Sequence, residues 1–185
     1  MLMAIHPSIQ QKAQKEIDEL LGGERLPALP DRDNLPYISA LIKEIYRWHA
    51  PLPISVPKLS KEDDFYKGYH LPKGATVMEN IWAVFYNPRV YPEPHIFNPE
   101  RFLKDGKLDQ SVEDPEDRVF GSSRRICPGR HFASRTVFLR IVTVLATFDI
   151  EPGLNDKGGV ETEIKFHEGV VRYADFCMIH DALSY

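Results

Sequence analysis

One of the two cysteines of this 185-residue chain stands in the stretch FGSSRRICPG, residues 120–129. Cys127 comes just before a Pro-Gly pair and a long apolar segment that predicts a helix. Unpaired backbone N–H groups and the positive end of a helix dipole favour an anionic sulfur at such a place. Arg124 and Arg125 add positive charge beside it. The surroundings therefore predict a thiolate with a chemical role.

Three roles are open to Cys127 on its residues alone. It could hold the iron of a haem, whose two propionates would bind neighbouring cations such as the arginine pair. It could be a nucleophile with His131 as its base, but His131 lies one turn further along the predicted helix and the sequence places no acid to orient it. It could also be a buried thiol at the start of a helix, without a chemical role.

Two other motifs place charged residues where they can position a loop. In KEIYRWHAP, Glu44 and Arg47 are three residues apart and so share one face of a predicted helix. In FNPERF, Arg101 lies inside residues 87–117, a Pro-, Asn- and Asp-rich segment without sustained periodicity. We expect a loop of this length to be held by side chains. Taken singly, the Glu-x-x-Arg spacing occurs by chance on many helices and would indicate no more than a surface ion pair.

Taken together and in this order, the three motifs resemble the carboxy-terminal part of the cytochrome P450 family. The cysteine loop of that family reads Phe, two residues, Gly, one residue, Arg, one residue, Cys, one residue, Gly. This chain matches it at Phe120, Arg125, Cys127 and Gly129. It departs from it at Ser123, where the family has glycine; serine there is expected to be strained if its backbone takes a glycine-type conformation. The similarity covers essentially the whole chain and looks closest to fungal or microsomal members.

The resemblance implies a haem cofactor whose iron is held by the thiolate of Cys127. Lys58 stands where the family commonly carries His or Arg to meet a propionate, and Arg125 is expected to pair with a propionate. The residues implied to contact the haem are Lys58, Phe120, Arg125, Cys127 and Gly129. The resemblance further implies that Glu44, Arg47 and Arg101 form a salt-bridged triad, with a structural role, that locks the loop under the cysteine.

The implied activity is that of a monooxygenase, which inserts one atom of dioxygen into a small organic substrate with electrons from an NADPH-dependent flavoprotein reductase. Only residues 52–56 and 169–171 are expected to approach the substrate. The acid–alcohol pair that the family uses to deliver protons to dioxygen is not found, and we expect its helix to precede residue 1. The alternative function is therefore that of a truncated, non-catalytic haem-binding fragment.

Composition excludes several other classes. The formal net charge is −4 and basic residues are interleaved with acidic ones, which argues against a nucleic-acid partner. Two cysteines cannot build the disulfide framework of a small secreted domain, so an intracellular, reducing compartment is expected. No stretch reaches the roughly 20 apolar residues that span a bilayer, although a full-length relative is expected to be anchored in the endoplasmic reticulum.

The elements that must position these residues predict a mainly α fold with small antiparallel β-sheets, an α+β class, in a single partial domain covering residues 1–185. Helices are predicted from Pro7 to the Gly22-Gly23 pair, over residues 38–46 and 81–86, and over residues 129–148, the last apolar nearly all round and so central. Strands of one small sheet are predicted at residues 65–66, 69–71 and 76–78, and terminal strands at residues 162–166 and 171–175.

Overall fold

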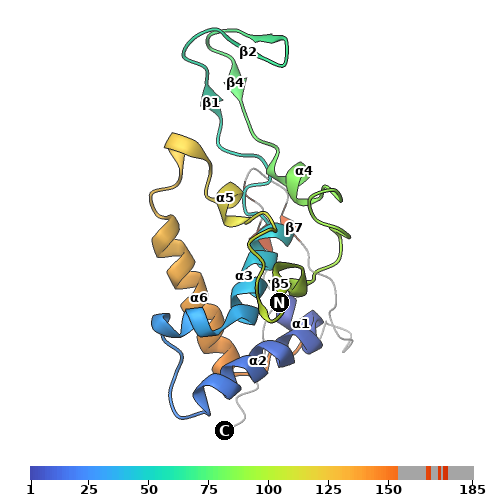
Figure 1. The fold of residues 1–185 in the computed structure, drawn as a ribbon, viewed down its shortest axis with the longest axis vertical. Helices are drawn as coiled ribbons and strands as arrows, with labels where there is room; N and C mark the ends of the chain where they lie inside the picture. Colours follow the sequence, from blue (N-terminus) through green and yellow to red (C-terminus); the bar gives the residue numbers. More distant parts are fainter. Residues whose placement is uncertain (154–165, 168–170, 172, 175–185) are drawn as a thin grey trace.

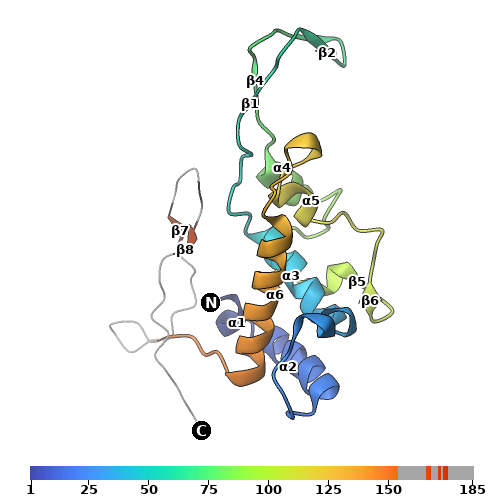
Figure 2. The same ribbon diagram turned by 90° about the vertical axis from the view of Figure 1, so that its left-hand side faces the viewer.

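The computed structural model describes residues 1–153, 166–167, 171 and 173–174. Helices form the body of the molecule, and the strands occur in two-stranded antiparallel sheets. A narrow β-ribbon projects from one end of the helical body (Figures 1 and 2). The predicted α+β class, mainly helical with small antiparallel sheets, is confirmed.

Helix α2 (Pro7–Leu21) follows the single turn α1 (Leu2–Ile5). Pro7 stands at the first position of the helix, where the N–H that proline lacks would have had no intrahelical partner. Gly22 ends the helix with a left-handed φ of +59°. Gln10 of α2 exchanges two hydrogen bonds with the backbone of Ile150, at 2.8 and 3.1 Å. The buried face of α2 is therefore attached to the segment that follows the last long helix.

Helix α3 (Pro36–Trp48) is the most buried helix of the described chain and follows a 3₁₀ segment, η1 (Leu29–Asn34). Its first N–H groups have no intrahelical partner, and the carboxylate of Glu16 from α2 accepts two of them, at 2.7 and 2.9 Å. Burial raises the pKa of Glu16, while these backbone hydrogen bonds oppose the rise. One side chain thus fixes where α3 begins relative to α2.

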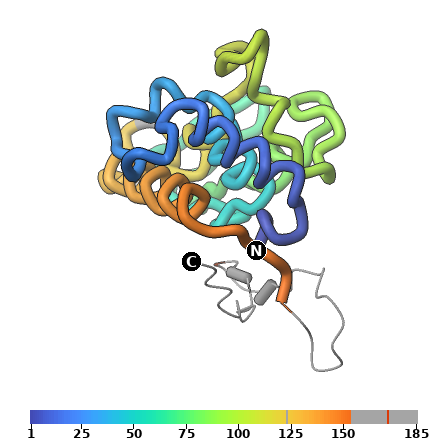
Figure 3. The backbone as a smooth tube through the Cα atoms, turned by 90° about the horizontal axis from the view of Figure 1, so that it is seen from below, coloured from blue at the N-terminus to red at the C-terminus, as the bar shows by residue number. Residues whose placement is uncertain are grey.

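Helix α6 (Arg130–Thr147) packs against α2 and α3, and Figure 3 shows α2 and α6 close together from below. Ser134, Phe138, Val142 and Leu145 are its buried residues, spaced four, four and three apart on one face. Phe132, on another face, is 78% exposed. The sequence predicted a central helix that is apolar nearly all round. In the described structure α6 packs against α2, α3 and η1, and its fully buried residues lie on one face.

The β-ribbon contains two small sheets, and the sequence predicted one. β2 (Asp64–Tyr66) pairs with β3 (Tyr69–Leu71) through the turn Lys67-Gly68, where both residues have positive φ. β4 (Thr76–Val77) does not join this hairpin. It pairs instead with β1 (Lys58–Leu59), because the turn at residues 72–75 sends the chain back past the closed hairpin.

The segment predicted to be irregular, residues 87–117, contains several short elements. After the predicted short helix α4 (Ile81–Phe85) come η2 (Pro99–Phe102) and a small hairpin. That hairpin joins β5 (Leu103–Lys104) to β6 (Lys107–Leu108). The start of α5 (Glu116–Val119) also lies in this segment. The rest winds around α3 as a loop that side chains hold.

Of the terminal strands, β7 (Phe166–His167) and β8 (Tyr173–Ala174) form an antiparallel pair. The remainder of the two predicted strands lies outside the described residues. In the part of the chain that the structure describes, no helix is both long enough and apolar enough to cross a lipid bilayer.

Candidate functional site: the cysteine loop and the buried charge network beneath it

Glu44 and Arg47 form a buried ion pair on α3, and both side chains are 0% exposed. Nε of Arg47 donates to Oε2 of Glu44 at 2.7 Å, and an Nη2 donates to Oε1 at 2.9 Å. Oε1 also accepts the backbone N–H of Asn98 at 2.8 Å. Two parallel charge-assisted bonds fix both side chains, and the third bond fastens the start of η2 to α3.

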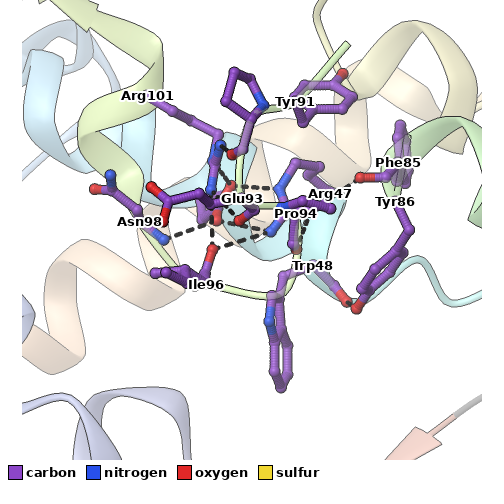
Figure 4. Close-up of polar contacts among 12 residues, drawn as sticks. Arg47, Trp48, Phe85, Tyr86, Tyr91, Glu93, Pro94, Ile96, Asn98 and Arg101 are labelled. Atoms are coloured by element: carbon purple, nitrogen blue, oxygen red, sulfur yellow. Dashed lines mark hydrogen bonds and ion pairs between the residues drawn. The ribbon is translucent and has the colours of Figure 1, made fainter. Parts of the chain in front are cut away.

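The guanidinium of Arg47 also holds the backbone of two other segments. One Nη1 donates to the carbonyl oxygens of Phe85, at 3.1 Å, and Pro94, at 2.9 Å. The rings of Tyr86 and Tyr91 lie 5.8 and 5.7 Å from the guanidinium carbon (Figure 4). Arg47 therefore satisfies carbonyls that would otherwise be buried without a donor.

Arg101 reaches the same carboxylate from η2, and Figure 4 shows it converging with Arg47. Its Nε lies 3.1 Å from Oε2 of Glu44, an ion pair without hydrogen-bond alignment. Its outer nitrogens donate to the carbonyls of Pro92 at 2.6 Å, Glu93 at 3.3 Å and Ile96 at 2.9 Å. The structure thus brings together the three residues of the expected triad.

The cysteine loop begins at the end of α5 and closes on itself before α6. The backbone N–H of Cys127 donates to the carbonyl of Phe120 at 2.7 Å, and its carbonyl accepts from Arg130 at 3.2 Å. Gly121 supplies the left-handed turn inside the loop, with φ of +77°. Ser123 opens a 3₁₀ helix, η3 (Ser123–Arg125), whose right-handed backbone does not require glycine.

The loop meets α3, the helix that carries Glu44 and Arg47, through an aromatic contact. The ring of Phe120 lies edge-on to Tyr46 of α3, with centroids 5.6 Å apart. Tyr46 is 8% exposed, and burial raises the pKa of its phenol to about 12. Tyr46 is the neighbour of Arg47 in the chain, so the cysteine loop and the triad are positioned by adjacent residues of one helix.

The donor set at Cys127 fits a haem iron. Its thiol is free and exposed, at the amino-terminal end of the long helix α6. A Cβ added at Gly129 would lie 3.7 Å from the sulfur, so the glycine leaves the sulfur uncovered. Arg125 is exposed and forms no ion pair with any described carboxylate, which leaves it open to an anionic group.

The two remaining expectations fare differently. Lys58 is half-exposed on β1 and pairs with Glu79, Nζ to Oε1 3.7 Å, so its ammonium already has an anionic neighbour. His131 accepts from Nε of Arg130 at 3.3 Å, and no hydrogen bond joins it to Cys127 in the described chain. The nucleophile–base pair thus gains no support from the geometry.

Sequence reasoning missed several residues that shape this region. Asn98 binds Glu44 through its backbone N–H. Every residue except proline has this group, so the residue type at position 98 could not predict the contact. Glu79 receives a hydrogen bond from Ser122 of the cysteine loop at 2.7 Å, although 43 residues separate them. In the sequence, Glu79 is a lone acidic residue after a β-prone segment, and this position does not indicate a contact with the cysteine loop.

Comparison with known proteins gives related sequences over nearly the whole chain. The protein-family model for cytochrome P450 matches residues 1–171. Cytochrome P450 monooxygenase COX2 of Coprinopsis cinerea is 48% identical over 163 residues, 88% of this chain and 31% of the relative. Cytochrome P450 monooxygenase claT of Ampulloclitocybe clavipes is 42% identical over 177 residues, 94% of this chain and 35% of the relative.

A third relative, cytochrome P450 monooxygenase ppsD of Aspergillus oryzae, is 44% identical over 171 residues, 92% of this chain and 32% of the relative. The chain therefore spans about a third of the length of these curated relatives. The family model covers residues that include the charge network, the cysteine loop and α6. This chain belongs to the cytochrome P450 family.

Proposed function

We propose that this chain is the haem-binding part of a monooxygenase in which Cys127 is the thiolate ligand of the iron. The observation that carries the proposal is the free, exposed thiol at the start of α6, in a loop closed by its own backbone and with an open arginine two residues before it. The family is a haem family, which supplies the cofactor that this donor set fits.

The residues of the chain have separate tasks in this proposal. Bound haem supplies an iron centre at which dioxygen is activated and one of its atoms is passed to an organic substrate. The positive end of α6 and the backbone around Cys127 stabilise an anionic sulfur. Arg125 binds a propionate by its guanidinium fork. Glu44, Arg47 and Arg101 hold the segments that pack beneath the loop and so limit its movement.

Electrons and substrate come from outside these residues. We propose an NADPH-dependent flavoprotein reductase as the electron donor and a small organic molecule as the substrate, because members of the family generally use such partners. We also propose that the whole enzyme is intracellular and anchored to the endoplasmic reticulum, as the resemblance to fungal and microsomal members of the family implies. The names of those relatives, all monooxygenases, support the reaction class.

The ligand assignment is tested by adding haem to the purified chain and recording the ferrous carbon monoxide adduct. A thiolate ligand gives a strongly red-shifted Soret band. We expect Cys127→Ala to abolish that band and the matched control Cys177→Ala to retain it. The proposal fails if Cys127→Ala keeps the band or if Cys177→Ala loses it.

The reaction class needs a second measurement. The haem-loaded chain is combined with a reductase and candidate substrates, and NADPH oxidation is compared with hydroxylated product. Product formed in proportion to NADPH supports a monooxygenase. Haem binding with NADPH oxidised only to peroxide would contradict the proposed reaction and would leave the haem assignment standing.

A further inference from the structure

The carboxylate of Glu79 joins the β-ribbon to the cysteine loop. Oγ of Ser122 donates to Oε1 of Glu79 at 2.7 Å. The ammonium of Lys58 lies 3.7 Å from the same oxygen, and a guanidinium nitrogen of Arg118 lies 3.8 Å from the other. The Glu79 side chain is 32% exposed, so water screens the two ion pairs. The short hydrogen bond to Ser122 is the strongest of these contacts.

The backbone of Glu79 is fixed before its side chain reaches the loop. Its N–H donates to Oγ of Ser55 at 2.7 Å, and its carbonyl accepts the N–H of Ser55 at 2.9 Å. The next residue, Asn80, pairs with Ile54 and caps α4 through Ala83 at 2.9 Å. Because the backbone is already fixed, only the rotamers of the Glu79 side chain must still be ordered when its carboxylate binds Ser122.

The loop on the other side of this contact needs an external attachment. Ser122 lies between Gly121, in the left-handed region at φ of +77°, and the 3₁₀ turn η3. Glycine allows many backbone conformations, so it does not by itself hold the loop in one of them. Five residues after Ser122 comes Cys127. The hydrogen bond between Ser122 and Glu79 therefore restrains the part of the loop that leads to the sulfur of Cys127.

We propose that Glu79 is a positioning residue for Cys127: its carboxylate holds Ser122, and through it the cysteine loop, against the base of the ribbon. The inference rests on the proposed function, in which Cys127 binds haem iron. In this arrangement Lys58 and Arg118 balance the charge of Glu79. Lys58 then serves as a counter-charge to Glu79 and is not free to bind a haem propionate.

The first test compares haem loss from the reconstituted wild type with loss from Glu79→Ala, Ser122→Ala and the double variant. Removing one hydrogen bond of this kind should speed haem transfer to a scavenger globin by about three- to tenfold. The double variant should lose haem no faster than the faster single variant, because both changes remove one contact. Glu79→Gln keeps an oxygen acceptor for Ser122 and should stay near the wild type.

A matched control separates this role from general loss of charge. Glu113 pairs with the same arginine, Arg118, at 2.7 Å, and contacts no part of the cysteine loop in the described structure. Glu113→Ala should leave the rate of haem loss unchanged. Glu79→Ala and Ser122→Ala should also increase the fraction of the ferrous carbon monoxide adduct that lacks the thiolate band, a signature that general destabilisation does not produce at equal haem content.

A measurement without haem keeps the inference separable from the proposed function. Amide hydrogen exchange of Cys127, whose N–H bonds Phe120, reports loop opening in the haem-free chain. Glu79→Ala and Ser122→Ala should speed it by the same three- to tenfold, about the worth of one hydrogen bond. If the wild type binds no haem but this acceleration of exchange is seen, the proposed function fails, while the restraint of the loop by the Glu79–Ser122 hydrogen bond is supported. Unchanged exchange, additive effects in the double variant, or tighter haem binding by Glu79→Ala would each overturn the inference.

Discussion

At the level of single residues, the fully buried Glu44 has two charged partners with buried side chains, Arg47 and Arg101. It accepts from Arg47 and from the backbone of Asn98, and Arg101 lies beside it at 3.1 Å. A carboxylate that is 0% exposed loses its water, and only charged partners with good geometry can compensate for that loss. The same accounting applies to Arg47, whose donors serve carbonyls of Phe85 and Pro94. Removing either residue would leave the other as a buried charge without its main partner.

Arg47→Ala and Glu44→Ala are therefore each expected to destabilise the chain by about 3 to 5 kcal/mol, because each leaves an uncompensated buried charge. The double variant should cost less than the sum. The free energy of unfolding by urea measures both. The exposed pair Lys15–Glu19, at 3.7 Å, is the matched control, and Lys15→Ala should leave the unfolding midpoint unchanged. Additive losses at Glu44 and Arg47 would mean that the two side chains do not interact.

Acid stability should depend on Asp31. Its carboxylate accepts two hydrogen bonds from Arg25, both at 2.7 Å, and the N–H of Ala28 at 2.8 Å, which lower its pKa from 3.8 to about 2. A depressed folded pKa contributes stability above the unfolded value, and that stability is lost as pH falls from about 4 to about 2. Asp31→Asn should flatten this part of the stability–pH curve, and Arg25→Gln should do so too. An unchanged slope in both variants would contradict the assignment.

At the scale of elements, the cysteine loop is held at several points and α6 begins directly after it. Its own backbone closes it between Phe120 and Cys127, Phe120 packs on Tyr46 of α3, and Ser122 binds Glu79 at the base of the ribbon. The last two attachments come from other parts of the chain, α3 and the base of the ribbon. The loop therefore takes its shape from its surroundings as well as from its own glycines.

Gly121 is a position of the cysteine loop where the left-handed φ of +77° favours glycine, and Ser123 stands at the start of the 3₁₀ turn η3. Gly121→Ala should lower the free energy of unfolding by about 1 to 2 kcal/mol, because a left-handed φ is strained for a residue with a Cβ. Ser123→Gly should not raise stability, and should lower it by up to about 1 kcal/mol, since glycine loses more backbone entropy in a helical turn. Thermal melts of both variants decide the matter. A stabilising Ser123→Gly would place the glycine-type conformation at residue 123.

For the whole molecule, α3 joins two apolar clusters. One side of it contributes Ile38, Leu41 and Ile42 to the core shared with α2 and α6. Its Ala40 belongs to a second cluster that includes Phe85 and Tyr91, near the buried charge network. Binding at the cysteine loop is thereby coupled to the folded state of the body, because loop, network and both clusters meet on one helix.

Haem should therefore stabilise the whole chain against heat. A ligand that binds only the folded state at about 100 times its dissociation constant adds about 2.7 kcal/mol. For a chain of this size that corresponds to a rise in melting temperature of about 5 to 10 °C. Calorimetry with and without haem measures the rise, and Cys127→Ala should remove most of it. An equal rise in Cys127→Ala would show that the thiol does not hold the cofactor.

The sequence by itself determined the helices whose signals are local. Apolar spacing, Pro7 and the Gly22-Gly23 pair were enough to predict α2 almost to the residue, because proline and left-handed glycine act on the backbone of their own segment. The pairing of Glu44 with Arg47 was equally local, since three residues along a helix place two side chains on one face. The order of the three motifs predicted the family, which comparison with relatives confirmed.

Tertiary structure decided what depends on residues far apart in the chain. β4 pairs with β1 and does not extend the β2–β3 hairpin, which follows from where the turn at residues 72–75 directs the chain. Which face of α6 is buried depends on the elements that pack beside it, and a helix that is apolar nearly all round does not indicate that face by its sequence. The contact of Glu79 with Ser122 joins residues 43 apart. Such contacts have no periodic signal, because they form only once packing has brought separate segments within hydrogen-bond distance.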